Sequence, residues 1–229
     1  MLFLKNHIAA GFEIPFLVTQ QEEHKGLGSL KVRTLPGFAL KVEYTYNFNE
    51  YIGITSGSKF GVQIFGYSAA ADAENFFISK DLSRKYFQMV PFFSIPLMLN
   101  LRIFISERNL LQVDLGAAVT FFTPGNTLST MSYRNGTATE QVFEMNLHFA
   151  EPPQFTLHAG LSYGLVVRNG NILKAGVSYD FGKRKMMKGD YSFHSHDVTV
   201  GSGKIFSSLN HLSVGVTYVF TRDVGLQKD

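Results

Sequence analysis

The segment that decides the fold class of this chain is Leu212-Ser213-Val214-Gly215-Val216-Thr217-Tyr218-Val219-Phe220. Large apolar side chains alternate there with small or polar ones, and the segment ends on an aromatic residue. Alternation with a period of two predicts a β-strand with one apolar and one polar face. The aromatic end is typical of a transmembrane β-barrel strand, whose ends carry girdles of aromatic side chains. Such a barrel requires several more strands of the same kind.

The alternation returns along most of the chain. Between residues 38 and 48 the even positions are all large and apolar, whereas the odd positions include Lys41 and Glu43. Between residues 87 and 105 every odd position is apolar, and this run is long enough to cross a bilayer as a tilted strand. We therefore expect about eight strands, at residues 4–17, 38–48, 51–65, 87–105, 110–122, 154–167, 171–182 and 205–220.

The connections between these strands alternate in length. Three short links lie at residues 49–50, 106–109 and 168–171, and the last contains Asn169-Gly170, a pair that favours a tight hairpin turn. Four long links lie at residues 18–37, 68–86, 123–153 and 183–204. The sequence thus predicts an all-β fold in a single domain over residues 1–229. It is an eight-stranded antiparallel up-and-down transmembrane β-barrel with short periplasmic turns and four long extracellular loops.

The composition excludes several classes of protein. The chain has 229 residues, a net charge of +3 and no cysteine, so we expect no disulfide, no cysteine-ligated metal, no cofactor and no binding of nucleic acid. It contains no apolar run long enough for a transmembrane helix. The first six residues do not form a signal peptide, so we expect the numbering to describe a mature chain. The nine residues after Phe220 are too few for a peptidoglycan-binding domain.

Three motifs resemble those of a known family. They are Tyr46-Asn47-Phe48-Asn49-Glu50-Tyr51, Ile95-Pro96-Leu97-Met98-Leu99 and Val216-Thr217-Tyr218-Val219-Phe220. On these residues the chain resembles the small eight-stranded outer-membrane barrels of the OmpX and OmpA-barrel kind, and more narrowly the "outer membrane protein beta-barrel" families of Bacteroidetes. The resemblance covers nearly the whole chain. It implies a place in the cell outer membrane among its lipids and lipopolysaccharide, and it implies no activity.

Charged residues at inward-facing strand positions are the first candidate site. An eight-stranded barrel is only wide enough for its own side chains, and unpaired buried charges are costly. We therefore expect a salt-bridge network that plugs the lumen. A narrow pore or proton path through the same residues is the alternative, because ionisable groups within a membrane are often functional. The candidates are four acids and four bases: Glu13, Lys41, Glu43, Lys59, Arg102, Asp114, Lys174 and Asp180.

Histidines form the second candidate set. The fourth long link contains His194-Ser195-His196-Asp197, and His158 and His211 occupy inward-facing positions. Histidine with serine and an acid occurs in enzymes that modify lipid A, but the spacing here matches no such motif. We expect solvated loop residues, and we keep metal binding and catalysis as alternatives. No residue is assigned as catalytic, cofactor-binding or metal-binding.

Two further surfaces are predicted in the long links. A basic run in the fourth link would lie where lipopolysaccharide phosphates are found, although a solvated charge run explains it as well. Its residues are Lys183, Arg184, Lys185 and Lys188. In the third link, Tyr133-Arg134-Asn135-Gly136-Thr137 predicts a hairpin turn. An apolar strand face follows, formed by Phe143, Met145, Leu147 and Phe149.

The apolar face in the third link has two interpretations. The first and second long links could cover it, with Phe76, Phe77 and Ile78 as the matching surface. Alternatively it docks a protein partner in the outer membrane. We expect a non-enzymatic barrel that acts as an accessory or scaffold subunit of a larger outer-membrane complex, or as a surface binding protein. A lipid A- or phospholipid-modifying enzyme and a narrow channel are the alternatives.

Overall fold

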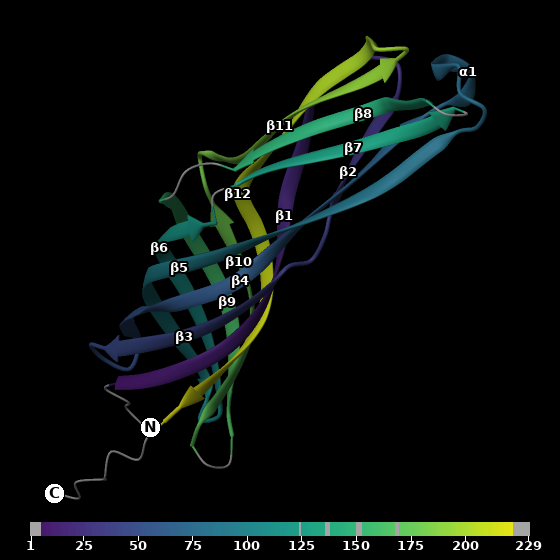
Figure 1. Cartoon of the computed structure of the whole chain (residues 1–229). Helices are drawn as coiled ribbons and strands as arrows, with labels where there is room; N and C mark the ends of the chain where they lie inside the picture. Colours follow the sequence, from purple (N-terminus) through teal and green to yellow (C-terminus); the bar gives the residue numbers. More distant parts are fainter. Residues whose placement is uncertain (1–5, 124, 136–137, 150–152, 168–169, 222–229) are drawn as a thin grey trace, which may run out of the picture.

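Eight antiparallel strands form a closed ring (Figure 1). The computed structural model describes residues 6–123, 125–135, 138–149, 153–167 and 170–221. The ring closes because the first strand pairs with the last, from Ile8 opposite Phe220 to Leu17 opposite His211. In ring order the strands are β1 (Asn6–Gly26), β3 (Phe38–Asn47), β4 (Ile52–Ala71), β5 (Leu82–Ser106), β6 (Asn109–Phe122), β9 (Gln154–Val166), β10 (Ile172–Phe181) and β12 (Val198–Phe220).

The ring confirms the predicted fold class, because each strand of the barrel overlaps one of the eight expected segments. Four of the strands are longer than expected. β1, β4, β5 and β12 continue well past the ring at the end away from both termini (Figure 1). The register of β1 against β12 is irregular between the pairs of Leu17 and Thr19, which is where the two strands leave the ring.

Most of the expected long loops are in fact β-structure. β2 (Ser29–Thr34) pairs with β4, and β11 (Lys185–Ser195) pairs with β12. β8 (Ala138–Phe149) pairs with β11, and β7 (Asn126–Asn135) pairs with β8. A short helix, α1 (Ala73–Phe76), lies at the far end (Figure 1). We call this whole part, residues 19–34, 65–90, 126–149 and 185–208, the extension. The turn of the β7–β8 hairpin at 136–137 lies outside the described residues, as do Arg168 and Asn169.

The outer face of the ring is apolar. Large side chains such as Leu40, Ile103 and Phe155 point outward and are exposed. Aromatic side chains gather near both ends of this belt, as expected for girdles built without tryptophan. Toward the short turns they are Tyr46, Phe48, Tyr51, Tyr163 and Phe220, and toward the extension they are Phe38, Phe60, Phe93, Phe121, Phe155 and Phe181. Such a surface is stable only in contact with apolar material.

The inward face changes character along the strands. On β4 the inward side chains within the ring include Thr55, Lys59 and Gln63, and those in the extension begin with Phe65 and Tyr67. The polar lumen therefore continues directly into an apolar core. Its largest buried members are Phe76, Phe143, Phe193, Met145, Leu147, Met186, Met187 and Ile205. Among the described residues, no helix is long and apolar enough to cross a membrane.

Candidate functional site

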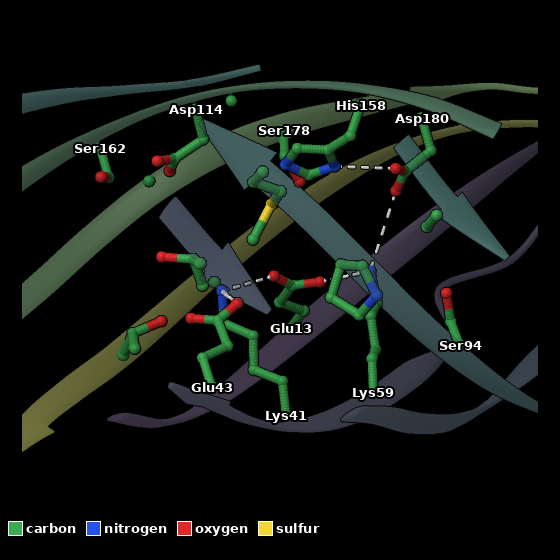
Figure 2. A pocket seen from close by; sticks show the side chains of 18 of the residues that line it. Glu13, Lys41, Glu43, Lys59, Ser94, Asp114, His158, Ser162, Ser178 and Asp180 are labelled. Carbon is green, nitrogen blue, oxygen red and sulfur yellow. Dashed lines mark hydrogen bonds and ion pairs between the residues drawn. The ribbon is translucent and has the colours of Figure 1, made fainter. Parts of the chain in front are cut away.

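A chain of ion pairs crosses the lumen (Figure 2). The Glu13 carboxylate forms ion pairs with Lys41 Nζ at 3.0 Å and with Lys59 Nζ at 2.6 Å. Lys41 Nζ also lies 3.1 Å from Glu43, and Lys59 Nζ lies 3.8 Å from Asp180. These side chains come from four strands, so they tie opposite walls of the ring together.

Two histidines extend this chain of ion pairs. His158 Nδ1 lies 2.8 Å from one oxygen of Asp180, and His211 Nε2 lies 2.7 Å from the other. With β9 and β12 included, the connected side chains come from six of the eight barrel strands. The prediction that His158 and His211 face inward therefore agrees with the structure, and both act as partners of a buried carboxylate.

A second network lies nearer the short turns. Thr55 Oγ1 donates to Asn100 Oδ1 at 2.5 Å, and Asn100 Nδ2 donates to Asp114 Oδ1 at 2.6 Å. Gln112 Nε2 donates to the same Asp114 oxygen at 2.6 Å. The Gln112 carbonyl oxygen accepts from Arg102 Nε at 3.3 Å and from Lys174 Nζ at 3.4 Å. Amide side chains thus join these three charged groups.

The eight inward charges do not form one salt-bridge network. Five of them share the ion pairs in the middle of the lumen. Among the described residues, no carboxylate oxygen lies within 4.0 Å of Arg102 or Lys174. Strand parity could predict which charges face inward. It could not predict their partners, because those depend on the stagger between strands that are far apart in sequence.

The His194-Ser195-His196-Asp197 segment does not form a catalytic triad. Ser195 Oγ donates to the backbone oxygen of Phe76 at 3.3 Å, and His194 Nε2 lies 2.8 Å from Ser192 Oγ. His196 and Asp197 form the exposed turn between β11 and β12. Within the described part of the chain, no group of three His, Cys, Asp or Glu side chains comes together as a metal site.

The apolar face predicted in the third link is covered. Phe143, Met145 and Leu147 are completely buried, and Phe149 packs at the edge of the same core. Phe143 packs against Phe193 of β11 with ring centroids 5.0 Å apart. Phe143, Met145 and Leu147 therefore present no surface to a partner, and Phe149 is only partly exposed, which corrects that prediction. The structure therefore agrees with the interpretation in which other links of the chain cover this face.

Among the three residues that were expected to cover this apolar face, only Phe77 does not. Phe76 and Ile78 are buried in the core, as expected, whereas Phe77 points outward with 75% of its surface exposed. The physical reason is local, since residues 73–76 form a helical turn in which neighbouring side chains do not face the same way. Phe77 follows it with a left-handed backbone, at φ +54°.

Three connections lie at this end of the extension and form what we call the tip, residues 26–28, 72–78 and 195–198. The Phe77 and His196 rings lie 6.1 Å apart, and Leu27 N donates to the Val200 backbone oxygen at 2.9 Å. Val198 is 63% exposed and Leu27 is 39% exposed. The tip therefore presents apolar side chains to water at the point farthest from the termini (Figure 1).

Backbone strain is concentrated at the tip. Phe77, His196 and Asp197 are the three described residues other than glycine with a positive φ. A bulky side chain in this conformation costs about 1–3 kcal/mol and persists only where the surrounding structure enforces it. No sequence signal marks this cluster, because it forms from three links that are distant in the chain.

Hydroxyl groups of tyrosine close the seam between β7 and the β4–β5 sheet. Tyr67 OH donates to Ser129 Oγ at 2.5 Å, and Tyr86 OH donates to the Thr130 backbone oxygen at 2.8 Å. Burial raises the pKa of Tyr67 to about 12, because the ionised phenolate would be poorly solvated in the core. Side chains rather than a backbone ladder therefore complete the wall of the extension here.

The basic run that follows β10 and continues into β11 is exposed. Lys183, Arg184, Lys185 and Lys188 all point to solvent, just beyond the apolar belt. Lys185 Nζ lies 3.8 Å from the centroid of the Phe206 ring, a cation–π contact. Contact with lipopolysaccharide phosphates is consistent with this position and stays a prediction.

Comparison with known proteins supports the fold. No protein-family model and no curated protein matches the chain. OprG, an outer membrane protein from Pseudomonas aeruginosa, has 14% identity and a TM-score of 0.52 over 95% of this chain and 96% of its own. The chain folds as an outer-membrane β-barrel.

Two other solved structures have lower TM-scores. AlkL has 17% identity and a TM-score of 0.42 over 99% of this chain and 96% of its own. Neisserial surface protein A has 10% identity and a TM-score of 0.40 over 93% and 96%, respectively. The narrower resemblance to the Bacteroidetes families has no matching family model behind it and stays a prediction.

The fold fixes the orientation of the molecule. The apolar belt is the surface that such a barrel presents to lipid, so the barrel lies in the cell outer membrane. Outer-membrane barrels have short periplasmic turns and long extracellular loops. The termini therefore face the periplasm, and the extension with its tip projects from the cell.

Proposed function

We propose that this outer-membrane barrel is a non-enzymatic surface binding protein, and that a protein partner binds the tip of its extension. The observation that carries the proposal is the exposed Phe77 side chain, which a left-handed backbone holds outside an otherwise well-packed core. Strain of this kind clusters at functional sites. Exposed aromatic side chains on an ordered scaffold are typical anchors of protein–protein contacts.

The construction of the extension supports a binding role. Its core contains the rings of Phe76, Phe143 and Phe193, and Ser195 links the β11–β12 turn to the residue before Phe77. The tip therefore needs little ordering on binding, which lowers the entropic cost of association. Its exposed apolar side chains come from three connections at the same end of the extension.

The lumen gives less support to a channel. Two side-chain networks cross the ring, and the apolar core follows immediately outside it. A hydrated ion would have to displace buried ion pairs and then enter a region without polar partners. The surface of the extension, rather than the lumen, is therefore the better candidate for function.

The test compares tip variants with a matched control. Phe77→Ser and Val198→Ser remove apolar surface at the tip, whereas Leu128→Ser removes a side chain that is 60% exposed on β7, away from the tip. Each variant is extracted from the native membrane in mild detergent, and proteins that travel with it in stoichiometric amount are identified. We expect one partner to be lost from both tip variants and retained by the control. A protein that runs alone, or equal retention in all variants, contradicts the proposal.

A further inference from the structure

The periplasmic end of the lumen contains a recess of about 720 Å³. It is separate from the ion-pair chain in the middle of the barrel. Three basic side chains line it, from His7 on β1, Arg102 on β5 and Lys174 on β10. Glu50 and Glu107 lie in the short turns at its mouth. The recess also has an apolar wall, formed by Phe104, Leu110, Val166, Ile172 and Val219.

The two permanent cations of the recess share one weak acceptor. Arg102 Nε and Lys174 Nζ both donate to the side-chain carbonyl of Gln112, at 3.3 Å and 3.4 Å. Asp114 is the nearest acid on the neighbouring strand, but its Oδ1 accepts from the amides of Gln112 and Asn100. A guanidinium has five N–H donors and an ammonium has three. Both cations can therefore donate further hydrogen bonds to a group in the recess.

The charge at the inner end of the recess, away from Glu50 and Glu107 at its mouth, matches a single negative charge. Arg102 and Lys174 contribute two positive charges, and Asp114 offsets one of them. Farther in, Glu43 is paired with Lys41. His7 Nδ1 accepts from Asn47 Nδ2 at 3.4 Å, which leaves its Nε2 as a neutral N–H donor. A dianion would leave excess negative charge in a site of low dielectric, where it is costly.

The shape of the recess separates a charged end from an apolar one. Arg102 and Lys174 lie deeper in the barrel than Phe104, Leu110 and Ile172, which are nearer to the short turns along their strands. A ligand with a carboxylate at one end and an aliphatic body at the other satisfies both parts. The carboxylate would accept charge-assisted hydrogen bonds, and the body would cover the apolar wall.

We propose that this recess binds an aliphatic monocarboxylate from the periplasmic side, with the carboxylate against Arg102 and Lys174. The carboxylate belongs either to a free acid or to the carboxyl end of a peptide. Glu50 and Glu107 at the mouth disfavour entry of anions with more than one charge. The site lies at the opposite end of the molecule from the tip, so it does not depend on the proposed surface binding.

The test measures binding to the purified full chain in zwitterionic detergent micelles by titration calorimetry. Octanoate is the probe for a free acid, and acetyl-leucyl-leucine is the probe for a peptide end. Octanol, inorganic phosphate and empty micelles are the controls. We expect saturable one-to-one binding of at least one carboxylate and none of octanol or phosphate. Absence of saturable carboxylate binding, or preferential binding of phosphate, overturns the proposal.

Charge-removing variants locate the site. Arg102→Gln and Lys174→Gln each remove one recess cation, and we expect each to weaken carboxylate binding at least tenfold. Arg108→Gln is the matched control, because Arg108 is exposed in the neighbouring turn and does not line the recess. The shift of the folded band on unheated gels reports whether each variant is folded. Equal binding by a folded recess variant and the control overturns the proposal.

Discussion

The Glu13 carboxylate on β1 forms an ion pair with Lys59 Nζ at 2.6 Å, although Lys59 lies two strands away on β4. Lys41 from the intervening strand binds the other oxygen. One buried carboxylate thus pairs with two lysines, and it is the group on which the ion pairs of the lumen converge (Figure 2).

Removing this carboxylate should destabilise the barrel. Glu13→Gln removes the negative charge that Lys41 and Lys59 share in the lumen. Removing one partner of a buried ion pair costs about 3 kcal/mol. We expect a lower urea midpoint for unfolding from lipid vesicles, measured by the gel shift of the folded barrel. Glu107→Gln in a periplasmic turn is exposed and should stay within about 0.5 kcal/mol of the parent. Equal midpoints for the two variants would show that the ion pairs contribute little.

The barrel should not conduct ions. Two networks cross the lumen, and the apolar core of the extension closes the path on the extracellular side. We expect no discrete conductance steps when the purified protein is inserted into planar bilayers. Reproducible steps that increase in number with added protein would instead favour the channel alternative.

The turn between β1 and β2 should tolerate only glycine at position 28. Gly28 has φ +86°, and a Cβ there would lie 2.6 Å from the Phe193 ring. Gly28→Ala should therefore destabilise the extension by about 2 kcal/mol, from backbone strain and displacement of a buried ring. Limited proteolysis of the intact barrel in vesicles measures this as faster cleavage of the extension.

Gly125→Ala is the matched control for this variant, because nothing lies within 4 Å of a Cβ at that position. It should leave the cleavage rate of the extension unchanged. Similar rates for the two alanine variants would mean that Phe193 does not pack on Gly28 as described.

Alkaline pH should loosen the seam that Tyr67 closes. The pKa of Tyr67 is about 12 in the folded state, against an ordinary value of 10.0, because its phenol is buried. The neutral phenol therefore stabilises the folded state fully below about pH 10, and this stabilisation is lost as the pH rises toward about 12.

The Tyr67→Phe variant separates this titration from other alkaline effects. It removes the bond to Ser129, so it should cost about 1 kcal/mol at neutral pH, yet its stability should decline less between pH 10 and 12. Near-ultraviolet circular dichroism in urea at several pH values follows both proteins. Parallel declines would show that Tyr67 does not titrate with folding.

Much of the barrel could be predicted from the sequence, because strand alternation is a local signal. It located all eight barrel strands and the inward charges. The same alternation is present beyond the ring, where Met187, Tyr191 and Phe193 alternate with polar residues and form β11 in place of the predicted loop. The length of a membrane strand does not limit a strand in water, so alternation within a long link predicts a strand beyond the membrane.

The candidate sites were less predictable, since each depends on contacts between distant segments. The division of the inward charges between two networks depends on the stagger between the barrel strands, which sequence alone does not give. The exposure of Phe77 follows from one helical turn between two strands. The tip exists because three connections lie at the same end of the extension. No sequence pattern within any one of them predicts this arrangement.

The most direct test of surface binding is site-specific photocross-linking on intact cells, with a photoreactive phenylalanine analogue in place of Phe77 or, as the control, of Leu128 on β7. Both positions are exposed, but only the first lies at the tip. Binding at the tip predicts a discrete cross-linked protein product from position 77 and none from position 128. No product at position 77, or the same product at both positions, would contradict the assignment of the tip as the binding site.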